Sequence, residues 1–165
     1  MNKESYSYRK SGDANLYFFV SEGTYGNITK SVSITRILSE FTNLPGQEIY
    51  NLAFGDFKII NGQWMIDDSS RSNNGDMPKV IATVAKVAIE FMHKNETAIL
   101  SFSGFMDKKS FELGRNQRTN LYQRAINSNF EELCKSFEII GVVKDHIEEY
   151  VLGTKYDRIL IKCKK

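Results

Sequence analysis

A run of small polar residues ahead of the longest predicted helix has the composition of an anion-binding loop. Residues 69–76 read SSRSNNGD. Backbone N–H groups at a helix N-terminus lack partners within the helix, and the helix dipole favours an anion beside them. An arginine adds bidentate contacts to phosphate oxygens. The alternative is an Asn-Gly turn followed by a helix that Asp76 caps. The candidate cofactor-binding residues of this loop are Arg71, Asn73, Asn74 and Gly75.

A second cluster is basic and lies within residues 108–124, from the end of a predicted strand into a predicted helix. Positive side chains near the end of a strand and the start of a helix can line a pocket for a phosphorylated ligand. An exposed, solvated surface is the alternative. The residues of this cluster that we assign to ligand binding are Arg115, Arg118 and Arg124.

Tyr122 is the candidate catalytic residue. It falls in the first turns of the second predicted helix, from which a tyrosine hydroxyl can enter a cleft and donate a proton. Its spacing to Ile126 equally suits an aromatic core residue. We predict no metal site, because the cysteines and histidines do not have the spacing of zinc ligands. These residues are Cys134, Cys163, His93 and His146, and the two cysteines are expected to pack as small apolar side chains.

The first half of the chain predicts an antiparallel β meander. Apolar residues alternate with polar ones, and Asn61-Gly62 is the residue pair that most readily forms a type I′ hairpin turn. Gly55 and Asp56 are expected to interrupt a strand with a bulge or bend. The predicted strands are Leu16–Ser21, Ile28–Ile37, Glu48–Phe54, Phe57–Ile60 and a last strand that ends near Asp68.

The second half predicts helices that alternate with strands. Asp76 and Pro78 suit the start of a helix over Met77–Lys94. Its apolar residues follow a 3.6-residue period, and the opposite side, with Thr83 and Glu90, is expected to face solvent. The fold class is therefore α+β, a single domain over 1–165 with a mixed central sheet. The remaining elements are a strand Ala98–Ser103, a helix Arg118–Lys135 that breaks at Asn127–Asn129, and strands Phe137–Val143 and Tyr156–Cys163.

The composition is that of a globular chain without a membrane-spanning segment. The chain has 165 residues, of which 41% are hydrophobic and 25% charged, enough for a hydrophobic core. Its longest apolar region, Val80–Met92, contains polar residues and is shorter than the ~20 residues that cross a bilayer. The first residues lack the apolar core of a secretion signal, so we expect a cytoplasmic protein. A formal net charge of +2 argues against a nucleic-acid partner.

The segments SNNGD, VIATVAKVAIEF and RTNLYQRAI resemble an uncharacterised family of small bacterial proteins, a domain of unknown function, from about Leu52 onward. In the order of its elements the chain also resembles GNAT-type N-acetyltransferases, in which a pyrophosphate-binding loop and helix precede a strand, a helix and a final strand pair. This resemblance implies acetyl-CoA as the cofactor. Arg71 and Asn74 fit the spacing of the loop motif, whereas Asp76 stands where Gly or Ala is expected. In the segment LYQR, Tyr122 matches the general acid.

Three functions remain open. An acyltransferase would hold the pyrophosphate of CoA on the backbone amides of residues 71–75, and Tyr122 would protonate the departing thiolate. A non-catalytic module would bind a nucleotide or another phosphorylated ligand with the arginines. A protein-interaction module would form homodimers through exposed aromatic residues of the meander. Those residues are Tyr6, Tyr8, Tyr17 and Tyr25.

Overall fold

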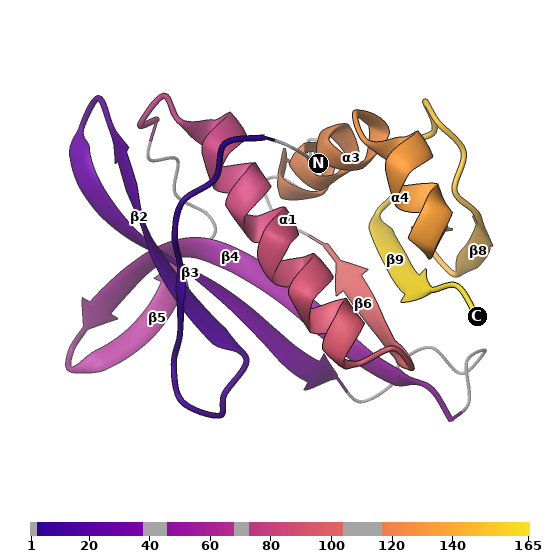
Figure 1. Cartoon of the computed structure of the whole chain (residues 1–165), viewed down its shortest axis with the longest axis horizontal. Coiled ribbons are helices and arrows are strands. Elements are labelled where there is room, and N and C mark those ends of the chain that lie inside the picture. The colour runs from indigo at the N-terminus through magenta and orange to yellow at the C-terminus, as the bar shows by residue number, and fades with distance from the viewer. Residues whose placement is uncertain (1–2, 38–45, 68–72, 104–116) are drawn as a thin grey trace. The chain divides into compact units, whose positions relative to one another are not determined.

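The computed structural model describes residues 3–37, 46–67, 73–103 and 117–165, without the side chains of Gln117 and Arg118. Nine strands form a mixed sheet, accompanied in these ranges by helices α1, α3 and α4 (Figure 1), so the α+β class is confirmed. The chain divides into two compact units. The N-terminal unit comprises Asn2–Thr35 and Leu52–Phe91, and the C-terminal unit comprises Arg36–Asn51 and Met92–Lys165. The single domain over 1–165 stays a prediction.

The N-terminal unit is built on two antiparallel hairpins. β2 (Leu16–Gly23) pairs with β3 (Gly26–Ile37), and β1 (Arg9–Lys10) pairs with the outer edge of β2. β4 (Glu48–Ile60) pairs with β5 (Gln63–Asp67). The meander prediction is therefore confirmed, with β1 as a short additional strand.

The turn of the second hairpin forms at the predicted residue pair. Asn61 and Gly62 both have positive φ, at 52° and 76°, as a type I′ turn requires. The predicted interruption at Gly55-Asp56 is wrong, because β4 is one continuous strand. Asp56 is aligned opposite Asp67 in the ladder, and its carboxylate accepts a hydrogen bond from the buried Lys30 ammonium.

Helix α1 (Met77–Lys94) has the predicted bounds. The predicted apolar side is buried, with Val80, Val84 and Phe91 each 3% exposed or less. The side expected to face solvent is only partly exposed: Thr83 is fully buried and Glu90 is half-buried. The reason is that the N-terminal segment of the chain lies along this side, as the hydrogen bonds below show.

The C-terminal unit holds a sheet in the order β6-β9-β7-β8, in which every neighbouring pair is antiparallel. β9 therefore lies between β6 and β7, although it follows both in sequence. Helix α3 packs against β9, and α4 packs against β7. The bounds are β6 (Ala98–Phe102), α3 (Gln117–Asn127), α4 (Phe130–Ser136), β7 (Phe137–Val143), β8 (His146–Glu149) and β9 (Arg158–Cys163).

The break between α3 and α4 occurs where the sequence predicts it. Ser128 Oγ donates to the carbonyl of Arg124 at 2.9 Å, and Asn129 Nδ2 donates to the carbonyl of Ala125 at 2.7 Å. Short polar side chains compete in this way for carbonyls that a continuing helix would use. The backbone N–H of Asn129 bonds to Ile126 instead of Ala125, which tightens the last turn and ends α3.

Gly141 of β7 allows an aromatic ring to lie directly on the strand. An added Cβ at Gly141 would stand 2.1 Å from Cε1 of Tyr156. The Tyr156 ring in turn packs on Tyr150 with 5.0 Å between centroids, and its hydroxyl donates to Glu148 Oε1 at 2.8 Å. The segment between β8 and β9 is held on the sheet by these contacts.

We predict that Gly141→Ala lowers the free energy of unfolding by about 1–3 kcal/mol, the usual cost of overpacking. The double variant Gly141→Ala/Tyr156→Leu should lose less than the sum of the two single losses, because the smaller side chain removes the clash. Chemical denaturation of the four proteins measures this coupling. Strict additivity would contradict the close approach of the ring.

Candidate functional site

Asn74, in the predicted anion loop, binds the turn of the β2–β3 hairpin. It is 3% exposed, and its backbone carbonyl accepts the N–H of Thr24 at 3.0 Å. Its side-chain Oδ1 accepts the N–H of Tyr25 at 2.7 Å. Its Nδ2 donates to Ser21 Oγ at 2.9 Å and to the carbonyl of Gly26 at 3.0 Å. This residue therefore satisfies backbone groups of a neighbouring turn.

The hairpin approaches the Asn74 backbone so closely that only glycine fits at position 23. A Cβ on Gly23 would stand 1.9 Å from the carbonyl oxygen of Asn74. The next polar residue, Asp76, accepts hydrogen bonds at Oδ2 from Ser21 Oγ at 2.6 Å and from the Tyr6 hydroxyl at 2.7 Å. Its backbone carbonyl accepts the N–H groups of Lys79 and Val80, which places Asp76 at the start of α1.

The N-terminal segment is fixed along α1 by two tyrosines. The Tyr6 N–H donates to Thr83 Oγ1 at 2.9 Å, and the Lys79 ammonium lies 4.4 Å from the centroid of the Tyr6 ring. The Tyr8 hydroxyl donates to Glu90 Oε2 at 2.6 Å. Burial and this hydrogen bond raise the pKa of Tyr8 to about 12, since ionisation would place a second negative charge beside the carboxylate. Burial and Asp76 likewise raise the pKa of Tyr6.

The predicted cofactor-binding residues differ in their exposure, because Asn74 is buried and the others that the structure describes are not. Asn73 and Gly75 have positive φ, at 47° and 81°, and both are exposed. Arg124 is also exposed and lies in the last turn of α3. Cofactor binding by these residues stays a prediction. Lying outside the described residues are Arg71, Arg115 and the side chain of Arg118.

Tyr122, the candidate catalytic residue, is packed in the core of the C-terminal unit. It is 5% exposed, and its ring meets that of Phe102 edge-on with 5.5 Å between centroids. This geometry is the one that the core alternative predicted. A proton-donor role for Tyr122 stays a prediction.

The aromatic residues that we expected on the surface of the meander are mostly engaged within the N-terminal unit. Tyr17 is 2% exposed, so its assignment to an exposed surface is wrong. Tyr6 and Tyr8 are half-buried by the contacts with α1 described above. Tyr25 alone of the four is widely exposed, at 70%.

The strongest exposed apolar feature of the N-terminal unit is the end of the β4–β5 hairpin. Four large side chains there, which we call the hairpin patch, are between 43% and 68% exposed. Ile59 and Trp64 are aligned opposite each other in the ladder. Strand alternation places Ile59 and Trp64 on one face of the hairpin and Ile60 and Met65 on the other. Large exposed apolar groups mark interaction sites on soluble proteins. The hairpin patch consists of Ile59, Ile60, Trp64 and Met65.

Sequence reasoning located the hairpin but missed the patch, although a signal was present. Ile59 and Ile60 are consecutive, and consecutive residues of a strand point to opposite faces. A hairpin with apolar residues on both faces of its last pairs buries only one face against its own chain. The doubled apolar pattern around Asn61-Gly62 therefore predicts an exposed apolar face.

A comparison with family models shows that the chain belongs to a family of unknown function (DUF6934), whose model matches residues 2–164. The match extends well beyond the region from Leu52 onward on which the sequence resemblance depended. No curated protein and no solved structure matches the chain. Membership gives the family but no activity.

None of the helices that the structure describes is long and apolar enough to cross a membrane. Among the described residues, no three His, Cys, Asp or Glu side chains are grouped as metal ligands.

We predict that Asn74→Ala lowers the free energy of unfolding by roughly 1–3 kcal/mol, because it removes the buried amide that pairs with the N–H of Tyr25 and the carbonyl of Gly26. Asn27→Ala, at an exposed position of the same hairpin, is the matched control and should change stability by no more than about 0.5 kcal/mol. Denaturant titration measures both. Equal losses would show that the Asn74 contacts contribute nothing specific.

Proposed function

We propose that this chain is a protein-interaction domain that forms homodimers through the hairpin patch. The observation that carries the proposal is the exposure of Ile59 at 68% and Trp64 at 58% on paired strands. Aromatic and large aliphatic side chains contribute most to the centre of protein interfaces. The hairpin patch offers such a centre, in place of the tyrosines that the sequence suggested.

The free edge of β5 supports pairing with a second copy. Within the described residues β5 pairs only with β4. Because Ile60 and Gln63 flank a two-residue turn, they form a hydrogen-bonded pair, and alternation turns the N–H and C=O groups of Trp64 and Ile66 away from β4. Two antiparallel β5 strands related by a two-fold axis at Met65 would place Trp64 of each copy opposite Ile66 of the other. These are the residues whose outward backbone groups can then pair.

The lack of charged side chains at the end of the β4–β5 hairpin also supports a second copy of the chain as the partner. Residues 59–66 contain no charged side chain, so nothing at the tip selects a charged partner. In the two-fold arrangement Gln63 lies opposite Asp67, and Asp67 is already paired with Lys58 in its own chain. No like charges oppose each other. Edge strands that avoid pairing usually carry a lysine or proline in such a position, and β5 has neither.

We predict that Met65→Lys weakens dimerisation at least tenfold, because two ammonium groups would face each other across the two-fold axis. Trp64→Ser should weaken it by a similar factor through loss of apolar contact. Sedimentation velocity over a concentration series measures the dissociation constant of each variant. Both positions are exposed, so thermal unfolding of the monomer, measured well below the dissociation constant, should stay close to that of the unmodified monomer.

Tyr25→Ser is the matched control, since Tyr25 is 70% exposed at the tip of the other hairpin. It should leave the dissociation constant unchanged. A monomeric chain at millimolar concentration would overturn the proposal, as would equal weakening by the control. Binding of the hairpin patch to a different protein, without self-association, would also overturn the second copy as the partner.

The order of elements favours acyl-CoA binding as a second candidate function. After β5 the chain continues with α1, β6, α3, α4, β7, β8 and β9, which apart from the short β8 is the order that the resemblance to acetyltransferases implies. In this proposal the pyrophosphate lies on the amides at the start of α1. The positive φ of Asn73 and Gly75 supports a loop whose N–H groups converge.

We predict that acetyl-CoA at about 100 times its dissociation constant adds about 2.7 kcal/mol to the stability of the chain. Acetyl-pantetheine, which lacks the pyrophosphate, should add much less. Thermal-shift measurement tests all of these, and no shift at millimolar acetyl-CoA would exclude this candidate.

A further inference from the structure

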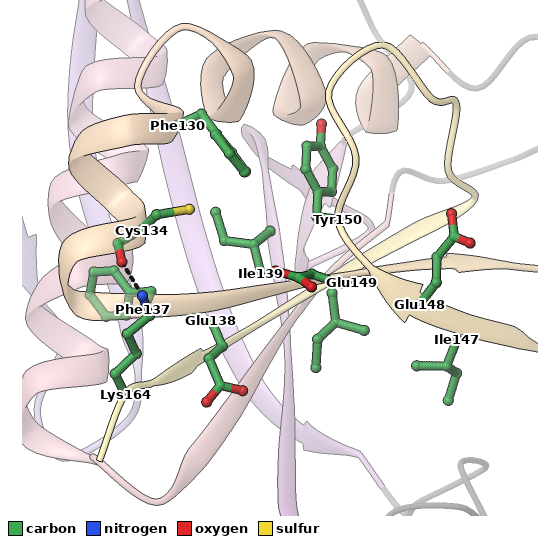
Figure 2. Close-up of a pocket in the computed structure, with 11 residues that line it drawn as sticks. Phe130, Cys134, Phe137, Glu138, Ile139, Ile147, Glu148, Glu149, Tyr150 and Lys164 are labelled. Carbon is green, nitrogen blue, oxygen red and sulfur yellow. Dashed lines mark hydrogen bonds between the residues drawn. The ribbon is translucent and has the colours of Figure 1, made fainter.

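A groove of about 480 Å³ lies in the C-terminal unit at the edge of β7. β8 pairs with β7 only along Ile140–Val143, so the first residues of β7 extend beyond the end of β8. Tyr150, just after β8, still donates its N–H to the carbonyl of Ile139 at 3.0 Å. The groove occupies the space beside this extension, between α4 and the segment that follows β8 (Figure 2).

One part of the groove is an aromatic and aliphatic wall. The rings of Phe130 and Tyr150 point toward each other (Figure 2), with 5.8 Å between their centroids. Phe137 and Ile139 of β7 line the same part. The Tyr150 hydroxyl donates to Asn127 Oδ1 at 2.6 Å, so the ring is held in place by its own tip. Such a wall suits the apolar body of a ligand.

The other part carries carboxylates. Glu138 is paired with Lys162 at 2.7 Å. Glu148 is aligned with Gly141 and therefore shares the face of Phe137 and Ile139, where it accepts the Tyr156 hydroxyl at 2.8 Å. Glu149 is exposed, and among the residues that the structure describes its carboxylate has no hydrogen-bond or ion-pair partner. A carboxylate in that position at the border of an apolar groove attracts a cation and repels an anion.

The remaining charge in the groove does not reverse this preference. The Lys164 ammonium is also part of the lining, and it donates to the backbone carbonyl of Cys134 near the end of α4. The lining thus has three carboxylates against one ammonium, in a chain whose formal net charge is +2. A phosphorylated ligand is disfavoured here.

Strand alternation separates the two parts of the groove. Residues paired across antiparallel strands share a face, so Glu149 shares a face with Ile140, whereas Phe137 and Ile139 lie on the other face of β7. A ligand that touches both the carboxylate and the aromatic wall must therefore pass the edge of β7. That requires a linear spacer between its cation and its apolar group.

We propose that this groove binds a small organic ammonium whose apolar group is separated from the charged nitrogen by several methylene groups. The ammonium pairs with Glu149, and the apolar group lies against Phe130 and Tyr150. The site is independent of the hairpin patch, since all of its residues belong to the C-terminal unit. The inference therefore stands or falls separately from homodimerisation.

The test uses 4-phenylbutylamine as the probe and the full chain as the protein. Calorimetry should show that it binds at least tenfold more tightly than 4-phenylbutanol, which lacks the charge, and than 4-phenylbutyrate, which carries the opposite charge. Benzylamine should bind more weakly than the probe, because its spacer is too short to pass the strand edge. Added salt should weaken the binding of the amine only.

Two variants locate the cation. Glu149→Gln should weaken binding of 4-phenylbutylamine at least tenfold and leave the weak binding of the alcohol unchanged. Asp145→Asn is the matched control, since Asp145 is exposed in the turn of the same β7–β8 hairpin but does not line the groove. It should have no effect beyond a small change that salt removes.

The cysteines report the position of the ligand. Cys134 lines the groove and Cys163 does not, and both are free and half-buried. The probe should slow alkylation of Cys134 and leave that of Cys163 unchanged, as mass spectrometry of the labelled peptides would show. Three outcomes would each overturn the proposal. They are no binding of 4-phenylbutylamine at about 10 mM, equal affinity for 4-phenylbutanol, and unchanged affinity of the Glu149→Gln variant for the amine.

Discussion

The buried amide of Asn74 is the constraint on which the N-terminal unit depends. Its Oδ1 and Nδ2, together with the backbone carbonyl of the same residue, all bond to the β2–β3 turn or the strands beside it, at a position only 3% exposed. A buried polar group without partners costs far more than a hydrogen bond gains, so the turn, Gly23 and the start of α1 must be placed together. Asp76 extends the same network to Tyr6, which brings the N-terminal segment onto the helix.

In the C-terminal unit the side-chain amide of Gln123 has a role similar to that of Asn74, because it bonds backbone groups of a neighbouring segment. The segment after β8 has little regular structure, so its backbone groups need other partners. Gln123 of α3 supplies two of them: its Nε2 donates to the carbonyl of Thr154, and its Oε1 accepts the N–H of Tyr156 at 3.3 Å. The Tyr156 ring then covers Gly141. Because this segment is fixed, Tyr150 is fixed as well, and the groove keeps a rigid wall although it borders a loop.

Local sequence patterns predicted most helices, strands and turns, because the bounds of these elements depend on residues close in sequence. The bounds of α1 and β7, the turn at Asn61-Gly62 and the break after Asn127 all follow from periodicity, capping and turn chemistry. β8 was missed because His146–Glu149 is short and contains two glutamates. The burial of Thr83 was also missed, since it depends on Tyr6, 77 residues away. Sequence spacing gives no measure of such a distant contact.

The same distinction explains what happened to the predicted sites. A loop of Asn, Gly and Asp before a helix has the composition either of an anion cradle or of a structural clamp, because both depend on polar groups at a helix start. Composition does not decide between these two roles, because the role depends on which group packs against the loop. For Asn74 that neighbour is a hairpin turn of the same chain. Glu149 and Trp64 show the reverse case: neither residue belongs to a motif, yet each presents to solvent a group that the described fold leaves available, a carboxylate and an indole. In this chain, the residues best placed to meet a partner are those that its own network does not use.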